Sequence, residues 1–189
     1  GAKGPNVNPV TACASATTAI GEAFETIKRG AADIMIAGGT EASITPSAVA
    51  GFGNMRAVNP SEDPDRASIP FDKERDGFVM GEGAGIMVLE TLEHAMARGA
   101  EILAELAGAG WTFDAFDQTA PASEPESYAM KVAMQTAGVA PADVQYVNAH
   151  GTSTRLNDPT ETRALKLAFG DHAYKLATSS PESMMRHAI

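Results

Sequence analysis

The chain has 189 residues, of which 44% are hydrophobic and 20% charged, a balance typical of a globular protein rather than a disordered or fibrous one. Its formal net charge of −10 at pH 7 argues against a general nucleic-acid binder, which needs a basic face. A single cysteine excludes an internal disulfide framework and fits a reducing compartment, so a cytoplasmic location is expected. No apolar run reaches the roughly 20 residues that cross a bilayer, so no membrane partner is expected.

The first predicted feature is a strand–turn–helix unit around the only cysteine. A β-prone run over 7–11 leads into Cys13, and a helix-prone run over 14–28 follows. At the first turn of a helix, unpaired backbone N–H groups and the positive end of the dipole favour an anion, which lowers the pKa of a thiol. A buried structural cysteine is the alternative, but the small residues around Cys13 leave room for a substrate. Cys13 is therefore the candidate nucleophile.

The rest of the chain alternates strand and helix patterns, which predicts the α/β class. A buried strand over 33–39 and a short helix opened by Pro46 precede a long polar loop over 56–77. The run over 78–90 predicts a strand rather than a dinucleotide-binding loop, because its apolar residues continue beyond the glycines. The remaining predicted elements are, in order, a helix over 91–98, a strand over 102–111, a polar loop over 112–125, a helix over 126–137, a strand over 144–148, a helix over 158–169, a strand over 175–179 and a helix over 183–189.

Two of the four histidines are candidates for chemistry. His150 follows a predicted strand, and ligands gather at the carboxyl ends of strands in α/β sheets. His187 lies in the last predicted turn, whereas His94 and His172 have the pattern of solvated surface groups. Cys13 with two imidazoles provides the parts for thiol-based acyl chemistry, a nucleophile and groups that move protons or stabilise an oxyanion. A zinc site is the weaker interpretation, because the paired Cys/His spacing of structural zinc sites is missing, so no metal is expected.

Five motifs occur in the order and spacing of the β-ketoacyl-acyl carrier protein synthases, and they most resemble the condensing enzyme II branch of that family. The motifs are TACA at 11–14, AGGTE at 37–41, PFDKERDGF at 70–78, GEGAG at 81–85 and NAHGTST at 148–154. The resemblance covers essentially the whole chain and implies a thiolase-like fold, a layered αβαβα arrangement of two related halves. It also implies that residues 1–189 are the central part of a ketosynthase domain with both termini missing, and that the isolated fragment is inactive as a synthase because it cannot complete a condensation.

The resemblance further implies an acyltransferase that performs a decarboxylative Claisen condensation in fatty acid elongation, without a free cofactor. Cys13 would take an acyl group from the phosphopantetheine thiol of acyl carrier protein. His150 and His187 would assist the decarboxylation of malonyl-carrier and stabilise the enolate oxygen. The full-length enzyme is expected to be a homodimer. The other implied roles are the pantetheine arm for Thr152, Thr154 and Thr119, a carrier contact for Arg56, and acidic support for Asp158 and Glu161.

The chain departs from the family pattern near its end. Glu182 stands where the family has a lysine that pairs with the acidic group matching Glu161, so the two glutamates are expected to face each other with like charge. Pro181 and Arg186 are expected to disturb the helix start that carries His187. Two alternatives remain open. One is the ketosynthase subunit of a type II polyketide synthase, which shares the motifs; the other is a non-catalytic structural partner of a ketosynthase, which the glutamate favours and the cysteine opposes.

Overall fold

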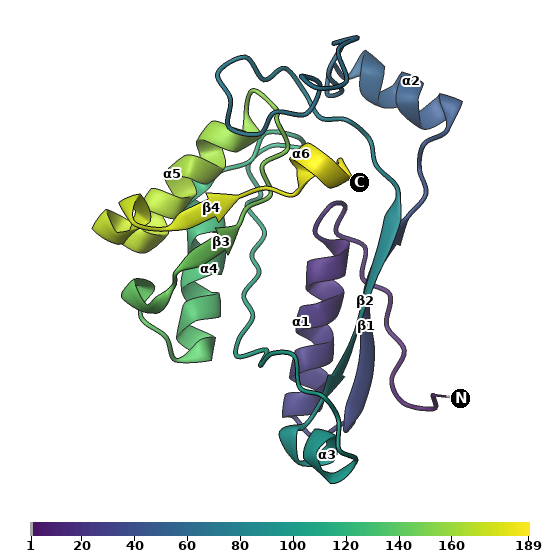
Figure 1. Ribbon diagram of the computed structural model, residues 1–189, viewed down its shortest axis with the longest axis vertical. Helices are drawn as coiled ribbons and strands as arrows, with labels where there is room; N and C mark the ends of the chain where they lie inside the picture. The colour runs from purple at the N-terminus through teal and green to yellow at the C-terminus, as the bar shows by residue number, and fades with distance from the viewer. Residues whose placement is uncertain (1) are drawn as a thin grey trace.

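The computed structural model describes residues 2–189 and places the elements in two groups, one from each half of the chain (Figure 1). The first half holds α1 (Ser15–Lys28), β1 (Ile34–Glu41), α2 (Pro46–Asn54), β2 (Gly83–Glu90) and α3 (Leu92–Ala97). The second half holds α4 (Ser123–Ala137), η1 (Pro141–Asp143), β3 (Tyr146–Asn148), α5 (Asn157–Phe169), η2 (Gly170–Tyr174), β4 (Ala177–Ser179) and α6 (Glu182–Met185). Helices and strands alternate in both halves, as the sequence predicts for the α/β class. Within the described chain, the helices all fall short of the length and apolarity that a membrane crossing needs.

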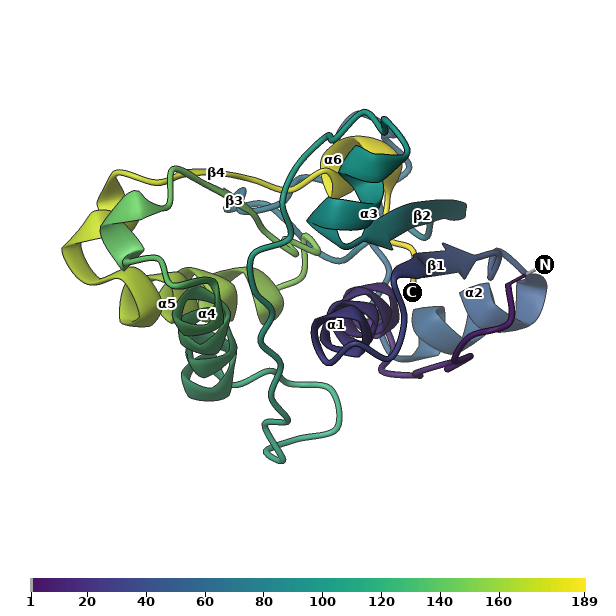
Figure 2. The same cartoon turned by 90° about the horizontal axis from the view of Figure 1, so that it is seen from below.

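The first half of the chain is built on the antiparallel pair of β1 and β2. Ile34 lies opposite Glu90 and Gly39 opposite Gly85, so the glycines of the second strand belong to the ladder. Their place inside a strand confirms the prediction that this run is not a dinucleotide-binding loop. Helix α1 packs along β1 (Figure 2), so closely that a Cβ on Gly39 would lie 2.7 Å from the Cβ of Ala16. This contact fixes the start of α1, the end of the helix that follows the cysteine.

The second half of the chain is built on the parallel pair of β3 and β4. Tyr146 lies opposite Ala177, and Asn148 lies opposite Ser179. Helices α4 and α5 lie side by side next to this pair (Figures 1 and 2), and their shared core contains Met134, Leu165, Ala168 and Phe169. Because the two strands are parallel, their carboxyl ends meet at one edge, where residues of a site gather in α/β sheets. Residues 149–154 and 180–187 leave the sheet at that edge.

Two of the predicted strands are wrong. Residues 7–10 lie outside every strand, and Val7 and Val10 are 65% and 82% exposed. Residues 102–111 are also outside the strands; this segment instead runs along α4, where the Thr136 hydroxyl donates to the Ala109 carbonyl and accepts from its N–H. Both runs have β-prone residues, but a strand exists only where a neighbouring strand completes its hydrogen bonds.

The helix boundaries follow their predicted start and stop signals, except at the start of α4 and in the last predicted helix. The Thr45 side chain caps α2 by accepting the Ala48 N–H at 3.3 Å, and Gly138 ends α4 in the left-handed conformation. Helix α4 begins at Ser123, earlier than predicted, and β2 begins later, at Gly83 rather than at residue 78. The predicted last helix is reduced to the four residues of α6, because Arg186 adopts a φ of 70° and turns the chain out of the helix.

The close pairing of β1 and β2 makes Gly38 intolerant of a side chain. Its φ is 153°, and a Cβ would lie 2.0 Å from the carbonyl oxygen of Gly85. We expect Gly38→Ala to lower the free energy of unfolding by about 3 kcal/mol, because it adds strain and overpacking. Urea unfolding followed by Trp111 fluorescence measures this. Gly85→Ala is the matched control, since a Cβ there would have no neighbour within 4 Å. Equal losses of stability for the two variants would contradict the expectation.

Candidate active site

Cys13 lies in a tight turn directly before α1 rather than at the end of a strand. Ala12 adopts a φ of 52°, a left-handed conformation that turns the chain sharply. The Ser15 hydroxyl locks this turn, because it accepts the Thr11 N–H at 2.8 Å and donates to the Ala12 carbonyl at 2.7 Å. Helix α1 begins at Ser15, so the cysteine is presented at the helix start, as predicted, with its thiol open to solvent on one side.

His150 lies in the loop that leaves the carboxyl end of β3. A buried glutamate holds this loop: Glu161 accepts the backbone N–H groups of His150 and Gly151 at 2.7 and 2.8 Å. From the other side, the Ser180 hydroxyl donates to the His150 carbonyl at 2.8 Å. Glu161 therefore supports the site by fixing the backbone that carries the imidazole, a more specific form of the acidic support that the sequence suggests.

His187 is held by backbone pairing with the segment that leads into β2. Its N–H donates to the Val79 carbonyl at 2.8 Å, and its carbonyl accepts the Gly81 N–H at 2.7 Å. The His187 side chain is 4% exposed, and its ring centroid lies 4.8 Å from that of Phe78. The residue follows α6 instead of belonging to it. Its position therefore depends on the first half of the chain, and the short last helix does not displace it.

The three candidate catalytic side chains converge. The Cys13 Sγ atom lies 3.2 Å from the His187 Nε2 atom, and the two imidazole centroids are 5.1 Å apart. One donor atom from each of Cys13, His150 and His187 lies within 4.8 Å of the other two. A nucleophile within hydrogen-bond reach of an imidazole is the geometry that nucleophilic catalysis requires.

Glu182 also joins this cluster, contrary to the sequence-based expectation that it faces Glu161. Its Oε1 atom accepts from the His187 Nδ1 at 2.7 Å and lies 3.2 Å from the His150 Nδ1. Its Oε2 atom is buried without a hydrogen-bond partner among residues 2–189. The expected like-charge contact is wrong because the Ser180 hydroxyl holds the Glu182 N–H, at 3.3 Å, and α6 starts with this carboxylate behind the two imidazoles.

These contacts change the pKa of every member of the cluster. Burial raises the pKa of Cys13, but hydrogen bonds from the two histidines outweigh it and lower the pKa to about 6. Burial lowers the pKa of the imidazoles, but contacts with Cys13 and Glu182 raise it to about 10 for His150 and about 9 for His187. Burial raises the pKa of Glu182, and the hydrogen bonds from both histidines bring it below its usual range. Near neutral pH the cluster therefore holds a thiolate, two imidazolium ions and a carboxylate.

Glu126 is an acidic group near the site that the sequence analysis missed. Burial and the charge of Glu161 raise its pKa to about 7, against the opposing effect of His150. It lies in α4, where a glutamate in the first turn of a helix is ordinarily explained by the helix dipole. No pattern in the sequence distinguishes it from Glu124, the other acidic residue of that turn.

Of the other predicted site residues, some lie in the loop that carries His150 and some lie elsewhere in the chain. The hydroxyl of Thr152, which is buried, pairs with that of Thr154 at 2.8 Å in the loop that also carries His150. Thr119 lies in an exposed loop, where its N–H and hydroxyl bind Asp117. Arg56 is exposed after α2. Within residues 2–189, no hydrogen bond links Thr119 or Arg56 to the Cys–His–His cluster, so their roles stay predictions.

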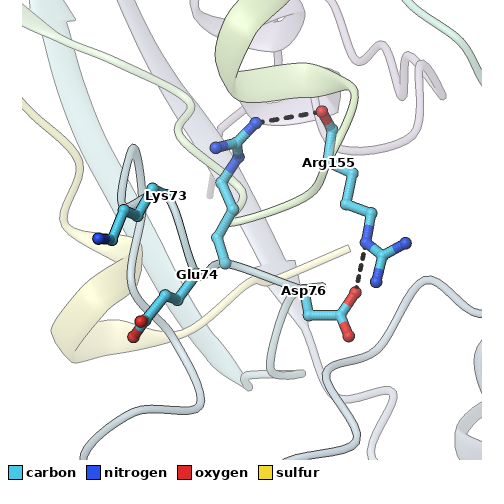
Figure 3. A pocket seen from close by; sticks show the side chains of 5 residues that line it. Lys73, Glu74, Asp76 and Arg155 are labelled. Carbon is cyan, nitrogen blue, oxygen red and sulfur yellow. Dashed lines mark hydrogen bonds and ion pairs between the residues drawn. The ribbon is translucent and has the colours of Figure 1, made fainter.

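Asp158 is a structural anchor for the long polar loop. It is 1% exposed, accepts the Phe71 N–H at 2.7 Å and lies 3.7 Å from the Arg75 guanidinium. Figure 3 shows the surface hollow beside this anchor, where Arg75 donates to the Arg155 carbonyl and Arg155 pairs with Asp76 at 2.7 Å. Charged side chains line the hollow, and none of them is a candidate nucleophile. We therefore infer that the charged residues of the hollow hold the long polar loop in place, and that the chemistry takes place at Cys13, His150 and His187.

Cys13, His150 and His187 are the one set of side chains among residues 2–189 whose ligand atoms could converge on a metal ion. Thiolate sulfur and imidazole nitrogen are ligands that Zn²⁺ uses. The sequence spacing does not reveal this set, because Cys13 lies at the opposite end of the chain from His150 and His187. In the free thiolate–imidazolium form, however, the nitrogen that faces the sulfur carries a proton and is not a ligand.

Comparison with solved structures places this fold among the thiolase-like ketosynthases. A type II polyketide ketosynthase, solved with its acyl-carrier protein and a hexaketide, matches with a TM-score of 0.90 and 39% identity, covering 93% of this chain and 44% of that one. A β-ketoacyl synthase from Burkholderia phymatum matches with a TM-score of 0.86 and 40% identity, over 93% of this chain and 42% of that one. The α/β class and the ketosynthase fold predicted from the motifs are therefore confirmed.

Comparison with family models gives the same answer. Residues 1–95 match the model described as "Beta-ketoacyl synthase, N-terminal domain", and residues 103–189 match "Beta-ketoacyl synthase, C-terminal domain". The chain belongs to the β-ketoacyl synthase family. It is 56% identical over its whole length to 3-oxoacyl-[acyl-carrier-protein] synthase 2 of Staphylococcus aureus and 53% identical to the protein of that name from Synechocystis. It spans about half the length of these relatives, 47% and 46%.

The low pKa of Cys13 predicts unusual reactivity toward an alkylating agent. Since the thiolate is the reactive form, we expect the rate of alkylation by iodoacetamide to rise with pH through a midpoint of about 6. Intact-mass spectrometry measures the rate at a single site, because the chain has one cysteine. The same chain in urea is the control and should titrate near the ordinary value of 9.0. A midpoint near 9.0 in the folded chain would contradict the charge assignment.

Proposed function

We propose that this chain carries the reaction centre of a 3-oxoacyl-acyl carrier protein synthase, which joins an acyl group on Cys13 to the two-carbon unit of malonyl-carrier. The observation that carries the proposal is the convergence of one thiol and two imidazoles within 4.8 Å. The names of the relatives support it. The whole reaction is an acyl transfer followed by a decarboxylative Claisen condensation.

The first half-reaction uses Cys13 as the acyl acceptor. Its thiolate attacks the thioester carbonyl of the acyl-carrier, and the pantetheine thiol leaves as the new thioester forms. The leaving sulfur takes a proton from the imidazolium of His187, whose Nε2 atom lies 3.2 Å from Sγ. The low pKa of the thiol, about 6, keeps it ionised at neutral pH and removes the need for a separate base.

The second half-reaction uses the imidazoles of His150 and His187 as donors to an oxyanion. Loss of carbon dioxide from the malonyl group leaves an enolate, whose oxygen needs hydrogen-bond donors already in place. His187 regains a proton from water after the pantetheine thiol has left, and the two protonated rings then supply N–H groups on the side that faces Cys13. The enolate carbon then attacks the acyl-Cys13 carbonyl, the C–S bond breaks, and the thiolate is restored.

Carrier recognition is assigned to the residues around this centre. Thr152 and Thr154 lie in the loop that carries His150, and we assign them, together with Thr119, to the pantetheine arm. Arg56 is exposed, and we assign it to contact with the carrier. The substrates arrive on phosphopantetheine, so the reaction needs no free cofactor. Assembly of the full-length enzyme as a homodimer in the cytoplasm belongs to the same proposal.

A type II polyketide ketosynthase is the second candidate function. The likeness to the hexaketide-bound ketosynthase, with a TM-score of 0.90, favours it specifically. Both candidates use the same thiol, the same imidazoles and a carrier-bound malonyl unit.

Acylation of the chain tests the proposed function. We expect incubation with octanoyl-acyl carrier protein to add one octanoyl group to Cys13, because the ionised thiol attacks thioesters. Intact-mass spectrometry measures the adduct, and peptide mapping locates it. Cys13→Ser is the matched control and should remain without the adduct at the same carrier concentration. A folded wild-type chain that stays unmodified would contradict the proposal and favour a non-catalytic partner of a ketosynthase.

A further inference from the structure

The position of Glu182 favours one tautomer of the neutral His187 ring, a property that the condensation does not use. Its Oε1 atom lies behind both rings, 2.7 Å from the His187 Nδ1 and 3.2 Å from the His150 Nδ1. The Nε2 atom of His187, on the opposite side of the ring, lies 3.2 Å from Cys13 Sγ. Carboxylate, imidazole and thiol are therefore lined up in that order, with the imidazole in the middle.

This order fixes which nitrogen carries the proton when His187 is neutral. A carboxylate only accepts hydrogen bonds, so the Nδ1 atom that faces Glu182 is the protonated one. The lone pair then lies on Nε2 and points toward the cysteine. A ring held in this tautomer is a general base at the reacting atom, which is the relation between acid, imidazole and nucleophile in hydrolytic triads.

Acylation of Cys13 creates the conditions in which this base is released. In the free chain the thiolate helps to keep His187 charged, because its contacts with Cys13 and Glu182 overcome burial and raise the pKa to about 9. An acylated sulfur has neither the charge nor the same hydrogen bond. The pKa of His187 then falls below about 9, and Glu182 alone keeps the neutral ring oriented. The cysteine turn is open to solvent, so water reaches the thioester.

Resting on the proposed acylation of Cys13, we infer that Cys13, His187 and Glu182 form a hydrolytic triad that transfers the acyl group to water. His187 Nε2 removes a proton from water, and the oxygen attacks the thioester carbonyl carbon. The tetrahedral intermediate collapses, the C–S bond breaks, and the proton on Nε2 passes to the leaving sulfur. Acyl-Cys13 and water thus become a free fatty acid and the thiol, with no change in oxidation state.

Glu182 is a positioning residue in this reaction, because it acts through His187 and does not touch the acyl group. Its second oxygen is buried without a partner among the described residues, so the two imidazoles, His187 at 2.7 Å and His150 at 3.2 Å, share the charge of this carboxylate. The titratable groups around His187 are Cys13 from the turn before α1, His150 from the loop after β3, and Glu182 itself. His150 in turn acts on the pKa of Glu126 of α4, which it lowers.

The test measures how fast the acyl group is lost from the chain after Cys13 has been acylated. The 189-residue protein is acylated with the octanoyl thioester of N-acetylcysteamine, freed of excess reagent, and placed in water enriched in oxygen-18. Intact-mass spectrometry follows the loss of the adduct from pH 6 to pH 10, and the released acid is analysed for one oxygen-18 atom. The same adduct in urea gives the rate without catalysis.

We expect the folded chain to lose the adduct faster than the unfolded chain and to release labelled octanoic acid. Glu182→Gln should slow this loss about tenfold or more, a part of the roughly 10²–10⁴-fold that general base catalysis contributes. It should also move the midpoint of the pH profile to lower pH, because an amide does not raise the pKa of His187 as a carboxylate does. Glu62→Gln is the matched control, since it removes one charge from an exposed loop residue.

The outcomes separate this inference from the proposed function. A chain that never forms the adduct overturns both. An adduct that forms but is equally stable in the folded and unfolded chain overturns the triad alone, and so does a Glu182→Gln variant with the wild-type rate and midpoint. If Glu182→Gln does not fold, the wild-type pH profile decides: a plateau above the pKa of His187 supports an imidazole base, whereas a rate that follows hydroxide throughout overturns it.

Discussion

The contact between the Cys13 thiol and the His187 imidazole is the interaction on which the site depends. Partly buried charges are costly unless partners compensate them. Here a thiolate and a carboxylate balance two imidazolium ions, and each group stabilises the charge of its neighbour. The contacts between Cys13 and the two histidines thus lower the pKa of the cysteine and at the same time raise the pKa values of His150 and His187. Removal of Glu182 would affect all of them.

The acidic residues near the site divide into two kinds according to what they bind. Glu161 and Asp158 are buried and accept backbone N–H groups, so they hold loops in place. Glu182 accepts from imidazoles, and its charge therefore enters the chemistry. The same side-chain type serves as scaffold in one position and as a charge partner in another, and only the direction of the surrounding donors distinguishes them.

Local signals made part of the fold predictable. The cap at Thr45 and the glycine at Gly138 act within a few residues, and both helices end or begin where these signals stand. The strands expected over 7–11 and 102–111 depended on partners elsewhere in the chain, which no local pattern reveals. Extended backbone without a partner strand is satisfied in other ways, as the bonds between Thr136 and residue 109 demonstrate.

The candidate site, like the fold, was predictable only where local signals in the sequence marked its residues. Cys13 stands before a recognisable helix start and His150 follows a recognisable strand, and the family resemblance assigned His187 to the same chemistry. The contacts of Glu182 were predicted wrongly, because its direction is set by a helix of four residues and by a serine hydroxyl that holds its N–H. Glu126 was missed because its raised pKa arises from burial and a neighbouring charge on another helix.

The two imidazoles of the site are attached to different parts of the molecule. His187 is bonded through its backbone to Val79 and Gly81, which lead into β2, and β2 pairs with β1 against the helix that follows Cys13. His150 instead belongs to the loop after β3, held by Glu161 of α5. If the two halves moved relative to each other, Cys13 and the His187 ring would therefore keep their contact, while the His150 ring would move away from them. The distance between the two histidines, unlike that between Cys13 and His187, therefore depends on how the two halves of the chain are placed.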